Sequence, residues 1–198
     1  MKKIILASKN AGKIQEFKQM LANYPVEVLS LLDLDYEDDI AETATTFVGN
    51  AQIKAKTIAA DNPGVFVVAD DSGLEIDALN GEPGVYSARY AKNDASDDEN
   101  IDKVLDLMRA VEEKKRSARF VCVLVLIDDA GVQHVVRGTC AGQILAERRG
   151  DGGFGYDPIF YLPQFGKSMA QLDKDAKNAI SHRGMAFGEL MKILGSVL

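Results

Sequence analysis

Two adjacent aspartates, Asp70 and Asp71, follow the apolar run 65–69, and no Lys or Arg lies near them in the sequence. Neighbouring carboxylates repel each other and burial raises their pKa, so such a pair is most easily kept ionised beside a cation such as Mg²⁺. Glu42 is a further candidate oxygen ligand. The same aspartates could instead belong to an Asp-Ser-Gly turn with solvated acids. The pair alone leaves the turn and the metal site equally open.

The segment 8–13, Ser-Lys-Asn-Ala-Gly-Lys, lies between a predicted strand and a predicted helix. Free backbone N–H groups and the helix dipole at such a turn favour an anion, and Lys13 adds a positive charge. The spacing is not that of a Walker A loop, which needs Gly-x-x-x-x-Gly-Lys-Ser/Thr. Phosphate binding and an ordinary capped turn both remain open for this segment.

Two further segments combine glycine, aromatic and basic residues. In 152–157, Gly-Gly-Phe-Gly-Tyr-Asp, the glycines allow close backbone approach and Phe154 could stack on a flat ring. In 177–184, Lys177, His182 and Arg183 offer hydrogen-bond donors. Each segment could also be structural, as a tight loop or a surface feature. Together with the turn and the acids, they supply the parts of a nucleoside triphosphate site.

A covalent nucleophile has no support in the sequence. Cys122 and Cys140 form no Cys-x-x-Cys motif and lie in strand-like apolar contexts, which predicts buried, reduced thiols. His134 lies on a predicted hairpin, as a surface residue, so His182 is the more interesting of the two histidines. We therefore expect chemistry that needs no covalent intermediate.

The elements that must position these residues alternate in type early in the chain and then form a hairpin. Apolar residues at helical spacing predict helices, and short β-rich runs predict strands. The predicted strands are 3–7, 26–29, 65–69, 74–79, 119–127 and 132–137, and the predicted helices are 14–21, 46–60, 97–113 and 185–194. The helix at 97–113 has an acidic first turn and a basic end, as the helix dipole prefers. This order predicts an α/β fold with a mixed sheet.

Length and composition limit the classes of function. The 198 residues suit one domain or two closely joined lobes, and 46% hydrophobic with 27% charged residues allows a sizeable core. The formal net charge of −7 argues against nonspecific binding to nucleic acid or to an anionic membrane, but not against a small phosphorylated ligand. No apolar run approaches membrane-spanning length and the N-terminal one is too short for a signal peptide, so we expect a cytoplasmic protein.

Five segments together resemble one protein family. They are SKNAGKIQEF (8–17), ETATTFVGNAQIKA (42–55), ADDSGLEIDALNGEPGVYSARYA (69–91), GGFGYDPIF (152–160) and KNAISHRGMA (177–186). In this order, and over nearly the whole chain, they are similar to the non-canonical purine NTP pyrophosphatases, also called inosine/xanthosine triphosphatases. The resemblance implies Mg²⁺-dependent hydrolysis of ITP, dITP and XTP to the monophosphate and pyrophosphate. It also implies a cytoplasmic homodimer, in which residues 1–198 form a single domain with a long twisted mixed β-sheet, flanking helices and two lobes forming a central substrate cleft.

The resemblance also implies roles for individual residues. Glu42 and Asp71 would bind Mg²⁺ with Asp70 close by, and Asp71 would also be the general base. The remaining residues would contact the nucleotide: Ser8, Asn10, Lys13 and Lys54 at the triphosphate, Ser72 beside it, Phe154 stacked on the purine, Gly155, Tyr156 and Asp157 shaping that wall, and Lys177, His182 and Arg183 reading the base.

The chain departs from the family pattern at two places near Glu42. Where the family often shows Glu-Glu-Thr-Gly and Glu-Asn-Ala, this chain has Ala41-Glu42-Thr43-Ala44 and Gly49-Asn50-Ala51. The missing acids leave the full set of magnesium ligands open, and fewer fixed carboxylates predict more metal-bound water.

The reaction that this reading predicts is in-line attack of water on the α-phosphorus, with pyrophosphate leaving. Either Asp71 deprotonates the water or Mg²⁺ delivers it. Two other functions stay open: a nucleotide-binding regulatory module that does not hydrolyse, and a phosphatase that releases orthophosphate. The acids speak against the regulatory module, because a pure binder gains little from carboxylates crowded near a polyanion.

Overall fold

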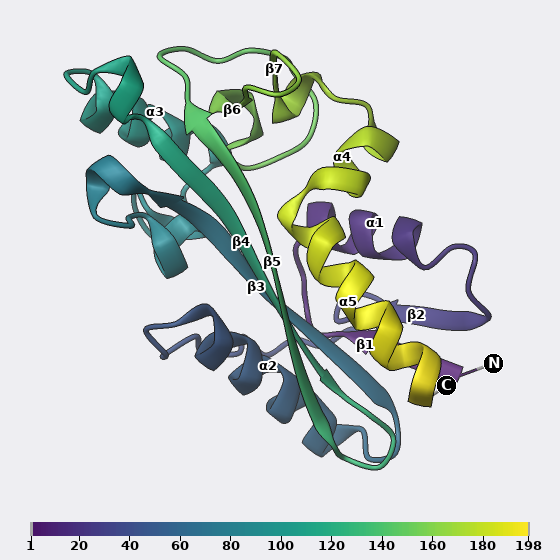
Figure 1. Ribbon diagram of the computed structural model, residues 1–198. Helices are drawn as coiled ribbons and strands as arrows, with labels where there is room; N and C mark the ends of the chain where they lie inside the picture. Colours follow the sequence, from purple (N-terminus) through teal and green to yellow (C-terminus); the bar gives the residue numbers. More distant parts are fainter. Residues whose placement is uncertain (1, 198) are drawn as a thin grey trace. The chain divides into compact units, whose positions relative to one another are not determined.

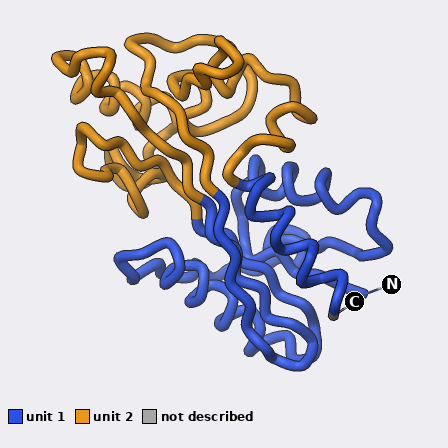
Figure 2. The backbone as a smooth tube through the Cα atoms, in the orientation of Figure 1, with its two compact units in different colours: residues 1–71, 122–138, 183–198 blue, residues 72–121, 139–182 orange. Residues whose placement is uncertain are grey.

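The computed structural model describes residues 2–197, which fall into two compact units (Figure 2). Unit 1 comprises 1–71, 122–138 and 183–198, and unit 2 comprises 72–121 and 139–182. The chain passes from one unit to the other inside three strands, at 71/72, 121/122 and 138/139, and once more at 182/183. Each unit therefore contains segments that are far apart in the sequence.

Strands of both units belong to one seven-stranded sheet. The strand order in this sheet is β2-β1-β3-β4-β5-β6-β7 (Figure 1). The strands are β1 Lys2–Leu6, β2 Val26–Ser30, β3 Phe66–Ile76, β4 Ser117–Ile127, β5 Gln133–Ile144, β6 Phe160–Leu162 and β7 Lys167–Ser168. β1 is parallel to both β2 and β3, whereas β6 is antiparallel to both β5 and β7. The sheet is therefore mixed, and the predicted α/β class is confirmed.

In unit 1, helices α1 (Ala11–Met20) and α5 (His182–Val197) lie on one face of the sheet and α2 (Phe47–Asp61) lies on the other (Figure 1). Successive strand residues face opposite sides, so alternate residues of β3 meet different helices. Phe66 and Val68 join the core cluster that α1 and α5 complete. Asp70 continues this alternation on the same side, and Asp71 lies on the side of α2.

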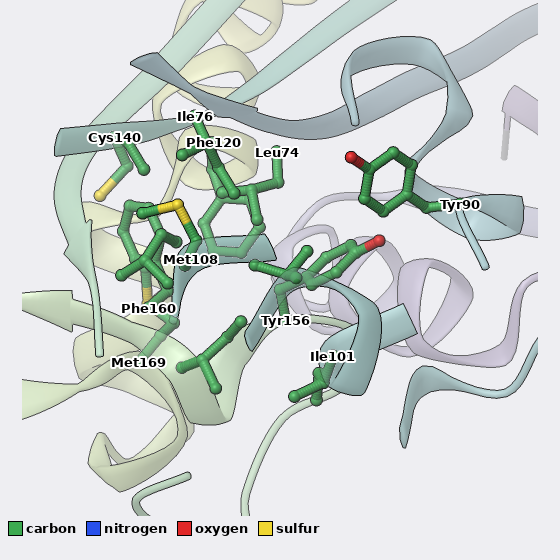
Figure 3. Close-up of a cluster of buried hydrophobic side chains, with 14 of the residues drawn as sticks. Leu74, Ile76, Tyr90, Ile101, Met108, Phe120, Cys140, Tyr156, Phe160 and Met169 are labelled. Atoms are coloured by element: carbon green, nitrogen blue, oxygen red, sulfur yellow. The ribbon is translucent and has the colours of Figure 1, made fainter. Parts of the chain in front are cut away.

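Unit 2 has its own apolar core, part of which is drawn in Figure 3. Helix α3 (Asp97–Met108) contributes Ile101, Val104 and Met108, each at most 1% exposed. A capping box at Ser96 begins this helix, since the Ser96 side chain accepts from Glu99 N and the Glu99 side chain accepts from Ser96 N. The short helix α4 (Lys174–Ile180) completes the unit's helices.

The structure corrects several predicted boundaries. Residues 70–73 form no turn, because β3 runs unbroken from Phe66 to Ile76 where two strands were predicted. Helix α3 ends at Met108 rather than at 113, and its last turn holds no basic residue. Val111 still packs against the core, but the run 112–116 that follows is charged throughout and has no apolar residue to bury. β5 and α5 are longer than predicted, and β6, β7 and α4 were not predicted.

Among the residues that the structure describes, no helix is long and apolar enough to cross a membrane. Both cysteines are free and buried, as predicted.

Candidate active site

Charged side chains of unit 1, most of them predicted site residues, form one group, which we call the charge cluster. Its carboxylates come from α1, the segment before α2, and β3, and its basic groups come from α1, α2 and α5. The members are Glu16, Glu42, Asp70 and Asp71 with Lys13, Lys54 and Arg183. Four acids and three bases leave the charge cluster about one charge negative when all are ionised.

Asp70 is buried, and positively charged side chains around it balance its charge. Its Oδ2 accepts a hydrogen bond from Arg183 Nε at 2.9 Å and from Cys122 Sγ at 3.3 Å, and its Oδ1 forms an ion pair with Lys13 Nζ. Burial by itself would raise the pKa of Asp70, but Arg183 and Lys13 outweigh it and hold this pKa well below its ordinary value. Asp70 is therefore an anion whose charge is already balanced by protein groups.

Asp71 has a different environment on the other face of β3. Its Oδ1 lies 3.4 Å from Lys54 Nζ, whereas its Oδ2 is buried and has no hydrogen-bond partner among the described residues. Burial raises the pKa of Asp71, and this effect prevails over the opposing influence of Lys54 and Lys13. Asp71 is the carboxylate of the pair that has an unused oxygen and an increased affinity for a proton.

Lys54 joins Asp71 to Glu42. Its Nζ lies 2.7 Å from Glu42 Oε1, and although burial lowers the pKa of Lys54, the charges of Asp71 and Glu42 raise it above its ordinary value. Two carboxylates that share one cation, one of them with an unused oxygen, fit a Mg²⁺ ion, which commonly takes one or two protein carboxylates together with substrate phosphates. No group of three or more His, Cys, Asp or Glu suited to a metal is present among the described residues.

The turn before α1 is organised as a helix N-terminus. Asn10 is the N-cap, and its Oδ1 accepts from Lys13 N at 3.0 Å, while Ser8 Oγ accepts from Asn10 N at 3.1 Å. The predicted anion-binding residues Ser8, Asn10 and Lys13 are thus brought together. Their hydrogen bonds to the backbone hold the Ser8 and Asn10 side chains at the N-terminus of α1, where an anion is favoured.

The predicted residues of unit 2 lie around one buried ion pair. Lys177 Nζ contacts Asp157 Oδ2 at 2.7 Å, and the same oxygen accepts from Phe154 N at 3.0 Å. Lys177 also lies over the Phe154 ring, 4.8 Å from its centroid. Asp157 therefore fixes both the loop that carries Phe154 and the cation beside that ring.

The other predicted residues of unit 2 have structural partners. Tyr156 is 5% exposed, and its hydroxyl donates to Ser87 O at 2.7 Å, while Gly155 N donates to Asp97 Oδ2 at 2.6 Å. The His182 ring stacks on that of Phe120, with centroids 4.7 Å apart. Their partners fix the shape of the loop and the start of α5.

The charge cluster and the Phe154 loop both lie in the part of the chain that matches a known protein family. The profile of the Ham1 family matches residues 4–193. The chain belongs to the Ham1 family.

The Ham1 relatives are similar over their full length. The chain is 48% identical to the dITP/XTP pyrophosphatase of Oceanobacillus iheyensis over 198 residues, which is 100% of both chains. It is 50% identical to the dITP/XTP pyrophosphatase of Geobacillus kaustophilus over 192 residues, 96% of this chain and 93% of the relative. Among solved structures, the Ham1 protein of Staphylococcus aureus matches with a TM-score of 0.87 and 43% identity over 98% of this chain and 99% of that chain.

Three residues of this Ham1-family chain that bear on the site were not predicted as site residues from the sequence. Glu16 forms a buried ion pair with Arg183, Cys122 contacts Asp70, and Asn50 accepts a hydrogen bond from Ala44 N. Glu16 lies three residues after Lys13 on α1, and only this helical spacing could have related the two in advance. Arg183, predicted to read the base, is 2% exposed and bonded to Asp70 and Glu16.

Proposed function

We propose that this protein is a nucleoside triphosphate pyrophosphatase that hydrolyses dITP, ITP and XTP to the monophosphate and pyrophosphate in the presence of Mg²⁺. The observation that carries the proposal is Asp71, a buried carboxylate with a raised pKa and an unused oxygen beside Lys54 and Glu42. The proposal is supported by full-length similarity to proteins named dITP/XTP pyrophosphatases.

In unit 1, we assign the triphosphate to Lys13, Lys54, Ser8 and Asn10. The dipole at the N-terminus of α1 and the charge of Lys13 favour an anion there. Glu42 and Asp71 would hold the magnesium ion, with Asp70 behind them as a neutralised neighbour. When bound, magnesium supplies positive charge that stabilises the phosphates and the leaving pyrophosphate.

Asp71 would act as the general base. A carboxylate with a raised pKa takes a proton more readily than an ordinary one, and proton transfer is most efficient when the pKa of the base approaches the working pH. The Asp71 carboxylate would accept the proton from the attacking water. Lys54, 3.4 Å from the other oxygen, would hold the carboxylate in place.

In unit 2, we assign the base to the ring of Phe154 and to the donors Lys177 and His182. The Lys177 ammonium group over the ring and the Asp157 carboxylate hold the Phe154 loop, and a flat ligand would stack on the Phe154 ring. Donors aimed at a 6-oxo group would be left unpaired by adenine, which costs about 1–3 kcal/mol for each buried group. The remaining nucleotide contacts would come from Ser72, Gly155 and Tyr156. Arg183 would act indirectly, by holding Asp70 in place.

One assay tests the proposal. Purified protein is incubated with Mg²⁺ and, in turn, with XTP, ITP, dITP, GTP and ATP, and pyrophosphate and orthophosphate are measured separately. Pyrophosphate release with the largest kcat/KM for XTP, ITP and dITP is the expected result. Release of orthophosphate would identify a phosphatase, binding without release would identify a regulatory module, and a preference for ATP would exclude the proposed specificity.

We also propose that the protein works as a cytoplasmic homodimer, as the resemblance to the family implies. Light scattering of the purified protein tests the oligomeric state, because a dimer has twice the chain mass of 21.5 kDa.

A further inference from the structure

The segment before α2 is attached to the first turn of that helix by a partly buried hydrogen bond. Ala44 N donates to Asn50 Oδ1 at 2.9 Å, and Asn50 is fully buried. Because a backbone N–H can only donate, this contact fixes which end of the Asn50 amide faces the segment. Asn50 Nδ2 makes no hydrogen bond within the described chain, so the oxygen is the atom that the fold uses.

The same turn of α2 carries a glycine whose missing side chain makes room for the segment. A Cβ added at Gly49 would lie 2.5 Å from Ala44 Cβ and 3.1 Å from Thr46 Oγ1. Gly49 lies within α2 with ordinary helical geometry, where glycine is a poor helix former, so conformation does not require it. Gly49 is needed for space, since the Ala44 methyl packs directly against it.

These two contacts hold the residue that bears the Glu42 carboxylate. Glu42 lies two residues before Ala44, and its Oε1 is 2.7 Å from Lys54 Nζ. Lys54 follows Asn50 by four residues, so both side chains project from one face of α2. The segment is therefore attached to that face at two points, one through the Ala44 backbone and one through Glu42.

We propose that Asn50 and Gly49 are positioning residues that set the place of the Glu42 carboxylate beside Lys54 and Asp71. This inference rests on the proposed function, in which Glu42 holds the metal.

The test uses two variants. The first fills the space between Gly49 and the Ala44 methyl, and the second restores it by removing that methyl. Gly49→Ala should lower kcat for XTP and raise the Mg²⁺ concentration needed for half-maximal rate, each by about tenfold, as is typical when the support of a metal ligand is lost. Ala44→Gly/Gly49→Ala should return both values to within about twofold of wild type, because the methyl added at 49 then no longer clashes with a methyl at 44. A crystal structure of each ligand-free variant supplies a readout besides activity: the Lys54–Glu42 contact is lost in the first and restored in the second.

Gly188→Ala is the matched control, because Gly188 is exposed on α5 and a Cβ there would meet no atom of the described chain within 4 Å. It should leave the Mg²⁺ dependence unchanged. If Gly49→Ala does not fold, Asn50→Ala and Asn50→Asp replace it, since only Asp keeps an acceptor for Ala44 N, and Asn50→Asp should retain the Lys54–Glu42 contact that Asn50→Ala loses.

Two results would overturn the inference: wild-type Mg²⁺ dependence in the single variant, or failure of Ala44→Gly to restore it. Failure of the proposed function looks different, because wild type itself would then release no pyrophosphate. The crystal structures would still decide whether Glu42 moves.

Discussion

Asp70 and Asp71 are the same residue type at adjacent positions, yet their surroundings give them opposite properties. Asp70 faces Arg183 and Lys13, and its pKa is held low, whereas burial prevails at Asp71 and its pKa is raised. The separation follows from strand geometry, because neighbouring residues of β3 project to opposite faces of the sheet. Of the two, only Asp71 combines a raised pKa with an unused oxygen, which suits it to accept a proton.

We therefore expect Asp71→Asn to lose turnover while it retains nucleotide binding. The amide has nearly the same shape but cannot take a proton, so kcat for XTP should fall by about 10²–10⁴-fold. Pyrophosphate release measures kcat, and calorimetric titration with XTP measures binding. Asp61→Asn, at the exposed end of α2, is the control and should keep wild-type kcat. Near-normal kcat in Asp71→Asn would rule out Asp71 as the base.

At the scale of elements, Asp70 joins β3 to α1 and α5. Lys13 comes from α1 and Arg183 from α5, and Arg183 also binds Glu16 of α1. Asp70, Glu16 and Arg183 are buried and Lys13 is half-buried, so removal of one partner leaves charges that have little solvent to stabilise them. The charge cluster therefore fixes two helices on one face of the sheet as well as supplying a site.

We expect Asp70→Asn to lower the free energy of unfolding at pH 7 by about 3–5 kcal/mol, because Arg183 and Lys13 lose their shared anion. The effect should depend on pH. The folded pKa of Asp70 lies below its unfolded value, so its stabilisation is fully present above about pH 4 and is lost as the pH falls through the folded pKa.

Urea unfolding of wild type and Asp70→Asn at pH 7 and pH 3, without divalent metal, measures this difference. The gap between the two proteins should narrow at pH 3. Asp61→Asn should stay within about 0.5 kcal/mol of wild type at both values. A gap that widens on acidification would show that Asp70 is not the stabilising anion.

The same cluster shows how far the sequence could predict the elements and the site. Local patterns predicted the βα turn with Lys13 and the helix with Lys54, because hydrophobic spacing is a short-range signal. They also ended the third strand at the aspartates, since unpaired acids are rare inside a buried strand. The partner that keeps Asp70 buried, Arg183, is 113 residues away in the sequence, and no local pattern relates the two.

At the scale of the whole molecule, two apolar cores share three strands. β3, β4 and β5 each pass from one unit to the other, so one end of a strand contributes to one core and the other end to the other core. Leu124 belongs to the core of unit 1 and Met108 to the core of unit 2, and both are fully buried. Loss of structure in either unit removes the continuation of strands that the other unit needs.

We therefore expect a single unfolding transition that either core can weaken. Leu124→Ala and Met108→Ala should each lower the free energy of unfolding by about 2–5 kcal/mol, since each leaves a cavity among fully buried side chains. Calorimetry should show one peak that moves to lower temperature in both variants. Leu107→Ala, next to Met108 but 47% exposed, is the control and should stay within about 0.5 kcal/mol of wild type. Two resolved peaks, of which each variant moves only one, would show instead that the units unfold independently despite their shared strands.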